Sequence, residues 1–409
     1  MTSLYSEKTG RFLDLENEYG AHNYHPLPVV LSKGEGVFVW DVDGKKYYDF
    51  LSGYSALNQG HCHPKIVASL IQQVQKLTLT SRAFCNDQFG GFARFATSLF
   101  GYAKLLPMNT GVEAVETAIK LCRRWGYDVK GIPENKARII VCSGNFHGRT
   151  SSVISFSTDP AAFTGFGPYM PGFDIIPFND LEALADALQN REVAGFLVEP
   201  IQGEAGVVVP DEGYLKTAAR YCKDANVLFI ADEIQTGLAR TGKMLACDHE
   251  GVRPDLLILG KALSGGMLPV SAVLADDDVM LTIKPGEHGS TYGGNPLASA
   301  IAITSLQVIL EEGLAANAAV QGEYLRKGIE SFHSPFIEAV RGKGLLNAMV
   351  IRHPDPEAAW HVCLNLMENG LLAKPTHGDK IRFAPPLTIT RTQVDECLDI
   401  IGDSLRILK

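Results

Sequence analysis

Two short apolar runs, each ending in a charged residue, constrain the fold of this chain more than any other feature. The first run opens the segment VLFIADEIQTG at residues 227–237, and the second opens LLILGKALSGG at residues 256–266. Uninterrupted apolar runs of this length are typical of parallel strands that are buried on both faces of a sheet. The sequence therefore predicts an α/β fold in which Asp232 and Lys261 stand at the ends of successive strands, where such sheets bind ligands.

These two charged residues suit a site for pyridoxal 5′-phosphate. A lysine at this place can form a Schiff base with the cofactor, and a carboxylate can pair with the pyridinium nitrogen. The lysine is also followed by the small residues Ser264, Gly265 and Gly266. The plain alternative is a lysine that reaches solvent from a strand end and an acid that caps a helix. Either residue alone fits that alternative, so the other motifs of the chain must decide.

The composition bounds what can be built around these strands. The 409 residues, of which 46% are hydrophobic and 20% charged, can bury a large core and predict one large domain with a smaller one. The formal net charge of −9 disfavours nucleic acid or an anionic membrane as the main partner and fits small anions better. No apolar run reaches the length of a membrane span, and the acidic opening segment is unlike a signal or transit peptide. We expect a cytoplasmic protein.

The cysteines and histidines give little support for disulfides or a metal. The eight cysteines form no CxxC pair and lie mostly in apolar segments, which predicts reduced core thiols in a reducing compartment. His61 and His63 are spaced by one residue, but no further cluster with metal-ligand spacing accompanies them. Pro64 then opens a helix for which we predict core packing of the apolar residues Ile66, Val67, Leu70, Ile71, Val74 and Leu77.

The smaller domain is expected to come from both ends of the chain. Two strand-like runs in the segment GVFVWDVDGKKYYDF flank Asp43 and Gly44, which predicts an antiparallel hairpin outside the main sheet. We expect residues 1–55 and 306–409 to build the smaller domain, and residues 56–305 to form the large domain that binds the cofactor.

A phosphate site is predicted in the segment NTGVEAVETAIKLCRRW at residues 109–125. A turn that contains Gly111 runs directly into a helix, whose free first-turn amides and positive dipole end can hold an anion without a lysine. Gly111, Val112 and Thr110 would line this site. The alternative is a helix that starts at a glycine and binds nothing. The chain has no GxGxxG and no GxxxxGK[ST] motif, so dinucleotide and nucleoside triphosphate sites lack their best support.

Two further strand ends supply planar and charged groups. Residues 137–150 predict a strand followed by Phe146, which can stack on a planar cofactor, and by Arg149, which can bind a carboxylate. Residues 194–206 predict another strand, which leads to Glu204 in a turn flanked by glycines. A helical segment between the two completes the alternation of strand and helix that a parallel sheet requires.

The last third of the chain holds two more candidate binding elements. The loop at residues 287–296 is rich in glycine and hydroxyl groups. Its Ser290 and Thr291 could donate hydrogen bonds to a phosphate, although a flexible linker would look similar. In the segment KIRFAPPL, Arg382 stands before two prolines that fix the loop, and a buried arginine so placed needs an anionic partner.

The motifs together, in their order along the chain, resemble those of a known family. NTGVEA, GNFHGRT, VEPIQGEAG, ADEIQTG, GKALSGG and HGSTYGGNP are similar to motifs of the fold-type I pyridoxal phosphate enzymes, and within these of the ω-aminotransferases. The segments GAHNYHPLPV, SGYSALNQGHCHPKI, TLTSRAF, LLAKPTHGD and IRFAPPL further resemble ornithine aminotransferases. The likeness covers nearly the whole chain. It implies a large domain with a mostly parallel sheet flanked by helices, and a smaller α+β domain.

The resemblance implies how the cofactor ring is held. Lys261 would carry the Schiff base, Asp232 would hold the pyridinium proton, Gln235 would contact the phenolic oxygen and Phe146 would stack on the ring. His147 stands beside the stacking aromatic, where ornithine aminotransferases often carry a tryptophan, although histidine is usual in the wider subgroup. This departure concerns the pocket edge and leaves the chemistry unchanged.

The resemblance also implies how the phosphate is held and how the chain assembles. Gly111 and Val112 would bind the phosphate of the same subunit. Thr291 would serve the phosphate site of the neighbouring subunit, so the active unit would be a homodimer or a higher assembly.

The reaction implied is the transfer of the δ-amino group of L-ornithine to 2-oxoglutarate, giving glutamate 5-semialdehyde and glutamate. Tyr24, Tyr54 and Arg149 would hold the α-amino and α-carboxylate end of ornithine. Glu204, which we count among the catalytic residues, and Arg382 would govern the distal side of the pocket.

Two other functions are compatible with parts of this pattern. A sister ω-aminotransferase that acts on acetylornithine or 4-aminobutyrate would share the cofactor site, but it gives no reason for both Tyr24 and Tyr54. A cofactor-free paralogue that serves as a scaffold would have no need of the intact Lys261 and Asp232. A visible absorption band from bound cofactor separates the scaffold from the enzymes.

Overall fold

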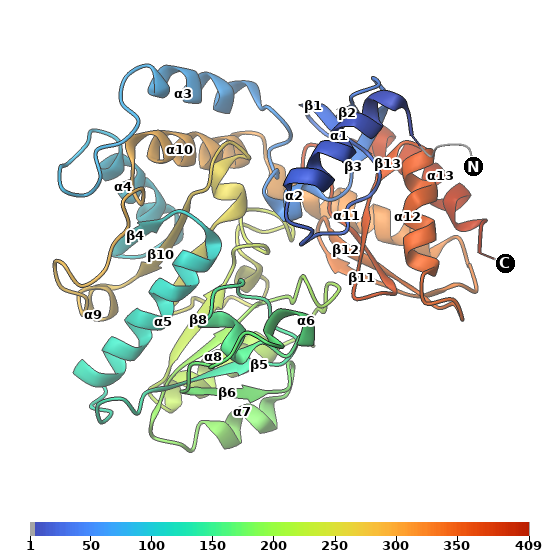
Figure 1. The fold of residues 1–409 in the computed structure, drawn as a ribbon. Coiled ribbons are helices and arrows are strands. Elements are labelled where there is room, and N and C mark those ends of the chain that lie inside the picture. The colour runs from blue at the N-terminus through green and yellow to red at the C-terminus, as the bar shows by residue number, and fades with distance from the viewer. Residues whose placement is uncertain (1–4, 409) are drawn as a thin grey trace.

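The computed structural model describes residues 5–408, whose strands form one sheet of seven strands and two of four (Figure 1). The order of the large sheet is β4-β10-β9-β8-β7-β5-β6. Its strands are β4 (Lys104–Met108), β5 (Arg138–Cys142), β6 (Phe173–Ile176), β7 (Val193–Val198), β8 (Leu228–Asp232), β9 (Leu256–Leu259) and β10 (Ser271–Ala275). Within the described residues only β10 runs antiparallel to its neighbours. The predicted mostly parallel sheet is therefore confirmed.

Helices cover both faces of this sheet because alternate side chains of a strand point to opposite sides. Ile139 and Val141 of β5 belong to the core on the side of α5, whereas Ile140 and Cys142 belong to the core on the side of α8. The helices that flank the sheet are α5 (Gly111–Asp128), α7 (Leu181–Ala187), α8 (Tyr214–Asp224) and α9 (Asp277–Met280). Both faces are thus buried, which explains why the central strands read as unbroken apolar runs.

The two strand ends that carry the predicted catalytic residues lie side by side. Strands β8 and β9 pair in parallel, with Asp232 opposite Ile258. Asp232 is the last residue of β8, and Lys261 follows β9 after a single glycine. The predicted placement of both residues at successive strand ends is confirmed. The strands that the sequence did not indicate, β4 and β6, are the two edges of the sheet, and β4 contains Pro107, which only an edge strand tolerates well.

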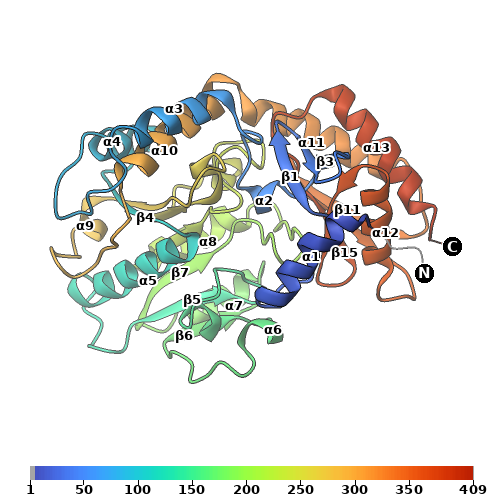
Figure 2. The ribbon, with the colours of Figure 1, turned by 45° about the horizontal axis from the view of Figure 1, so that its top comes forward.

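Segments from both ends of the chain build the two smaller sheets. The first has the order β1-β2-β3-β13 and the second β11-β12-β15-β14. Their strands are β1 (Leu31–Glu35), β2 (Phe38–Asp41), β3 (Lys46–Asp49), β11 (Ile337–Lys343), β12 (Leu346–Ile351), β13 (Leu371–Leu372), β14 (Lys374–Thr376) and β15 (Lys380–Phe383). Strands β2 and β3 form the predicted hairpin, with Gly44 at φ 88° in its turn. Figures 1 and 2 show β1 to β3 beside the C-terminal helices.

The remaining long helices join or cover these sheets. They are α1 (Glu7–Tyr19), α3 (Pro64–Val74), α4 (Phe89–Phe100), α10 (Pro296–Glu311), α11 (Leu314–Glu330), α12 (Ala358–Glu368) and α13 (Arg391–Leu405). Helix α10 packs on α3 and α4, and it runs through residue 305, where we placed the end of the large domain. The boundaries at residues 55 and 305 stay a prediction.

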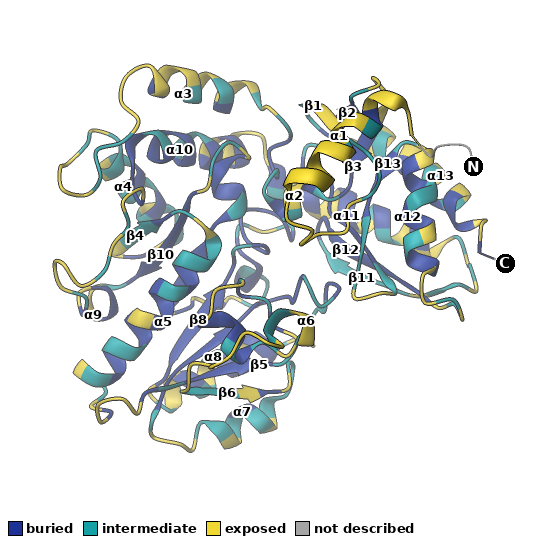
Figure 3. Cartoon of the chain, viewed as in Figure 1, coloured by how far each residue is buried: buried dark blue, intermediate teal, exposed yellow. Residues whose placement is uncertain are grey.

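Helix α3 begins at Pro64 as predicted, but its apolar face is not all core. Ile66 is fully buried, whereas Ile71 is 51% exposed and Val74 is 47% exposed. The expectation that all its apolar residues pack in the core is therefore wrong within a single subunit. The physical reason is that α3 lies outside α10 and packs on it along one side, so its outer side faces away from the protein (Figure 3).

Three properties of the described residues bear on the environment of the protein. No single helix in residues 5–408 is both long and apolar enough to cross a membrane, although the pair α10 and α11, bent by 60° at their junction, meets the criteria of length and composition. All eight cysteines lie in this part of the chain and are free, but Cys62 and Cys85 are exposed, so these two are not the core thiols we expected. The pair His61 and His63 bonds to Asp49 and Glu312.

Candidate active site

One cavity beyond the ends of β8 and β9 brings the predicted cofactor residues together. Its lining includes Gly111, Val112, Phe146, Asp232, Gln235 and Lys261. These residues come from three different strand ends, those of β5, β8 and β9, and from the start of α5, which the parallel sheet gathers at one edge. Three residues that we considered for the phosphate, Thr110, Ser290 and Thr291, do not line this cavity in the described chain.

Lys261 sits in a strained backbone position at the start of a short 3-10 turn, Lys261–Ser264. Its φ of 43° is left-handed, which is costly for a residue with a side chain and is typical of functional sites. The hydroxyl of Ser264 donates to the Lys261 carbonyl at 2.8 Å and fixes this turn. Burial lowers the pKa of Lys261, and the carboxylates of Glu204 and Asp232 oppose that shift. The amine is thus easier to deprotonate than an exposed lysine, as a nucleophile or a proton carrier requires.

Asp232 is paired with a residue whose role the sequence did not show. The ring atom Nδ1 of His147 lies 2.7 Å from Asp232 Oδ2, and the backbone N–H of Ile234 donates to Asp232 Oδ1 at 3.1 Å. The His147 side chain is fully buried from solvent, and the residue lines the cavity beside Phe146. Burial alone would lower the pKa of His147, but its hydrogen bond to Asp232 and the negative charge of Asp232 raise this pKa. Its Nε2 is buried without a partner among residues 5–408.

Glu199 adds a second buried carboxyl group to this cluster. It follows β7, and its Oε2 accepts a hydrogen bond from the backbone N–H of Phe146 at 2.9 Å. Burial raises the pKa of Glu199 to about 7, and the nearby Asp232 adds to this while His147 opposes it. The bond to Phe146 fixes the backbone from which the predicted stacking ring projects. Glu199 stands where the strand predicted within residues 194–206 ends, and the sequence showed no role for it.

The start of α5 has the form of an anion site. Thr110 is the N-cap, its hydroxyl accepts from the Glu113 amide, and the Glu113 carboxylate accepts from the Thr110 amide at 2.7 Å. This capping box satisfies its own two amides and leaves those of Gly111 and Val112, which have no partner within the helix. A side chain at Gly111 would come within 3.1 Å of Ile234, so the backbone there lies close against the end of β8.

Arg382 has the anionic partner that we expected for it, and this partner is Glu204. Arg382 Nη1 donates to Glu204 Oε1 at 2.6 Å, and the Arg382 side chain is only 3% exposed. Gln235 Nε2 donates to the same oxygen at 3.0 Å. Burial would raise the pKa of Glu204, but the charge of Arg382 and its hydrogen bond lower it, so the carboxylate stays ionised at neutral pH. The predicted contact of Gln235 with the phenolic oxygen of the cofactor stays a prediction.

The other predicted substrate residues lie around this ion pair. The Arg382 guanidinium lies 4.8 Å from the ring centre of Tyr54, and that of Arg149 lies 5.8 Å from the ring centre of Phe146. Tyr54 has φ 59°, a strained position that aims its side chain, and burial raises its pKa. Tyr24 is 67% exposed but close enough to Tyr54 to influence that pKa. These groups form one rim, although no direct bond joins Tyr24 to it in the described residues.

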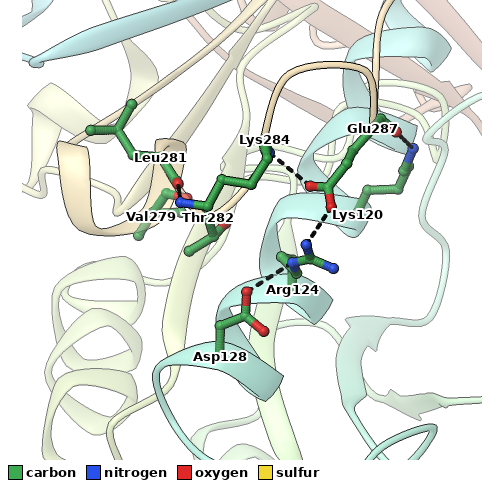
Figure 4. A network of polar contacts seen from close by, with 8 residues as sticks. All are labelled: Lys120, Arg124, Asp128, Val279, Leu281, Thr282, Lys284 and Glu287. Atoms are coloured by element: carbon green, nitrogen blue, oxygen red, sulfur yellow. Dashed lines mark hydrogen bonds and ion pairs between the residues drawn. The ribbon is translucent and has the colours of Figure 1, made fainter.

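Thr291 lies in an exposed loop that is fastened to α5. Glu287 bonds to Arg124 at 2.5 Å through its carboxylate and to Lys120 at 3.1 Å through its carbonyl (Figure 4). Ser290 receives a hydrogen bond from Asn109 at 2.7 Å. The loop is therefore anchored on the N-terminal side of Thr291, which is exposed and does not line the described cavity of its own chain.

Comparison with known proteins places this arrangement. The family model for class-III aminotransferases matches residues 19–405. The chain belongs to the class-III aminotransferases. This aminotransferase is 60% identical to the mitochondrial ornithine aminotransferase of Rattus norvegicus, over 99% of this chain and 94% of the relative.

Two solved structures show the same likeness in three dimensions. The crystal structure of ornithine aminotransferase from Toxoplasma gondii ME49 is 48% identical and superposes with a TM-score of 0.96, covering 99% of this chain and 96% of that one. The crystal structure of acetylornithine aminotransferase from Elizabethkingia anophelis is 56% identical with a TM-score of 0.90, covering 98% of each chain.

The cofactor of this family is pyridoxal 5′-phosphate, and the residues present fit it. A half-buried lysine lines the cavity, free helix amides stand at one side, and the buried carboxyl group of Asp232 stands at another. The Nε2 of His147, buried beside this carboxyl group without a partner among residues 5–408, is a further polar atom that could serve a polar cofactor. The donor set therefore matches a planar, phosphorylated, protonated ring.

Proposed function

We propose that this aminotransferase passes the δ-amino group of L-ornithine to 2-oxoglutarate and so forms glutamate 5-semialdehyde and glutamate. The observation that carries the proposal is the 2.6 Å ion pair between Glu204 and Arg382 beside Tyr54. A pocket that serves both substrates must be neutral for one and cationic for the other. An arginine whose charge is masked by a movable carboxylate meets both needs. The likeness to ornithine aminotransferases supports the same function.

The residues of the large domain would perform the chemistry. Pyridoxal 5′-phosphate, when bound, supplies a protonated ring that takes up negative charge from the reacting carbon. Asp232 would keep the ring nitrogen protonated, with His147 holding the carboxylate in place. Lys261 would carry the cofactor and then, as a free amine, move the proton at the reacting carbon. Gly111 and Val112 would hold the phosphate through their amides.

The rim residues would decide which amino group reacts. Tyr24, Tyr54 and Arg149 would hold the α-amino and α-carboxylate end of ornithine, leaving its δ-amino group to reach the cofactor. The α-carboxylate of 2-oxoglutarate would displace Glu204 and bind Arg382 in a bidentate pair. Glu204 would then return to Arg382 when ornithine enters, because an unpaired buried arginine is costly.

We also propose that the active unit is a homodimer or a higher assembly. The exposed and anchored Thr291 would reach the phosphate site of the neighbouring subunit, and the exposed apolar side of α3, with Ile71 and Val74, supplies surface for such a contact.

We further propose that the protein is located in the cytoplasm. The free cysteines fit a reducing compartment. The rat relative is named mitochondrial, so fractionation of cells that express the tagged chain tests the location.

One experiment tests the reaction. The purified protein is mixed with ornithine, acetylornithine or 4-aminobutyrate, each alone, and the absorption of the bound cofactor is followed. We expect ornithine to change it fastest and the product to cyclise to pyrroline-5-carboxylate. Acetylornithine is the second candidate, because the Elizabethkingia structure carries that name. A faster reaction with acetylornithine, or an α-keto acid as the product from ornithine, contradicts the proposal.

A further inference from the structure

The loop that carries Glu204 is a closed turn held by its own backbone. Gln202 and Val208 exchange backbone hydrogen bonds at 3.1 and 2.9 Å, and the amides of Gly206 and Val207 both donate to the Gly203 carbonyl at 3.1 Å. A side chain at Gly203 would collide with the Gln235 amide, so the turn lies directly against the cavity wall. The backbone of this turn is fixed by these bonds, whereas the Glu204 carboxylate pairs with Arg382 through a side-chain contact that a substrate could replace.

Residues of the second small sheet grip the same turn from the other side. Thr376 Oγ1 donates to the Glu204 carbonyl at 3.0 Å, and Arg341 Nε donates to the Gly206 carbonyl at 2.8 Å. The stem of Lys380 lies against Gly206, where an added side-chain atom would come within 2.2 Å of it. The turn is therefore tied to the small sheet by its backbone, independently of the Glu204 carboxylate.

One hairpin supplies both the backbone tie and the partner of the carboxylate. Thr376 ends β14 and Arg382 lies in β15, and the two strands pair with Thr376 opposite Lys380 and Lys374 opposite Arg382. The hairpin thus holds Glu204 at two points, at its carbonyl through Thr376 and at its carboxylate through Arg382. If a substrate carboxylate takes Arg382, the second point is lost and the first remains.

We propose that Thr376 is a positioning residue that keeps Glu204 next to Arg382 while the Glu204 carboxylate is displaced, and so sets how strongly Glu204 competes with a dicarboxylate substrate. This inference rests on the proposed exchange of partners by Arg382. Without the Thr376 hydroxyl, the turn loses one of its ties to the hairpin, and the return of Glu204 becomes less favourable. Dicarboxylates then bind Arg382 against weaker competition.

The test compares Thr376→Val, which removes the hydroxyl and keeps the shape, with Thr376→Ser, which keeps the hydroxyl. Thr388→Val is the matched control, because the Thr388 hydroxyl is buried without a hydrogen-bond partner among residues 5–408. Two quantities are measured on the holoenzyme: the dissociation constant of glutarate, a dicarboxylate that cannot donate an amino group, by calorimetry, and the rates of the ornithine and glutamate half-reactions by stopped flow. Glu204→Ala and wild type are measured alongside.

For Thr376→Val we expect glutarate to bind about fivefold more tightly and the glutamate-to-ornithine rate ratio to rise by about the same factor, as the loss of a hydrogen bond of about 1 kcal/mol implies. Thr376→Ser should lie near wild type, Thr388→Val should leave both quantities unchanged, and Glu204→Ala should show a larger effect of the same sign. An unchanged ratio in Thr376→Val beside a shifted ratio in Glu204→Ala overturns this inference alone. Equal losses in both half-reactions, with a lower Tm, also overturn it. An unchanged ratio in Glu204→Ala refutes the proposed exchange and this inference with it.

Discussion

Replacing His147 by leucine is the sharpest test of how this site holds its catalytic carboxylate. The change removes the 2.7 Å hydrogen bond to Asp232 and leaves that carboxylate with the Ile234 amide as its bonded donor among the described residues. Asp232 is 5% exposed, so solvent cannot replace the lost partner. The carboxylate then loses the contact that fixes its position, so it is less well placed to keep the ring nitrogen of the cofactor protonated.

The size of the effect follows from the kind of bond that is lost. A hydrogen bond to a charged group contributes about 1.5–3 kcal/mol. If the whole of this free energy is lost from the stabilisation of the transition state, the rate falls by about 10- to 150-fold. The measurement is the single-turnover rate of the ornithine half-reaction at saturating ornithine, followed by stopped-flow absorbance. His147→Asn is the matched variant, because its amide nitrogen can take the place of Nδ1 as a neutral donor, and we expect an intermediate loss.

Cofactor binding and Tm separate this effect from a general loss of structure. We expect His147→Leu to bind pyridoxal 5′-phosphate and to unfold within a few degrees of wild type, since leucine fills most of the buried space. A His147→Leu rate within about twofold of wild type would refute a role for this histidine in holding Asp232, since twofold is about 0.4 kcal/mol. The same conclusion follows if His147→Asn is as slow as His147→Leu.

Three further predictions concern the other charged groups. Lys261→Ala should abolish turnover and still bind the cofactor non-covalently through the phosphate and ring contacts, which equilibrium dialysis and a rate assay measure together. Arg382→Ala should slow the 2-oxoglutarate half-reaction by an amount equal to about 2–5 kcal/mol and affect the ornithine half-reaction less, as stopped flow of each half would show. Glu199→Gln should remove part of the pH dependence of stability. The folded pKa of Glu199, about 7, lies above its ordinary value of 4.5, so the native state of wild type loses stability as the pH rises from about 4.5 to 7. Denaturant unfolding across this range should show a flatter profile for the variant.

Features that depend on a single segment of the chain could be predicted from the sequence. The runs before Asp232 and Lys261 are apolar on both faces, which requires burial between helices and places their last residues at the sheet edge. The helix start at Gly111 also shows in the sequence, because a capping threonine stands directly before it. The chemistry of the site follows from such local signals, since the parallel sheet brings strand ends together whatever lies between them.

Contacts between distant segments could not be predicted from the residues alone, and they determine how the site is tuned. His147 and Asp232 are 85 residues apart. His147 follows β5 and Asp232 ends β8, with β7 between them in the sheet, and the motif GNFHGRT does not predict that the imidazole contacts β8. The hydroxyl of Thr376 reaches the Glu204 carbonyl across 172 residues and from another sheet. In both cases the side chain meets a group that would otherwise lack a partner, a buried carboxylate oxygen or a turn carbonyl. Burial makes an unpaired polar group costly, so the fold satisfies these groups with whichever donor the packing brings near. The local motifs thus set which residues react, and the long-range pairs set the charge and position that each one holds.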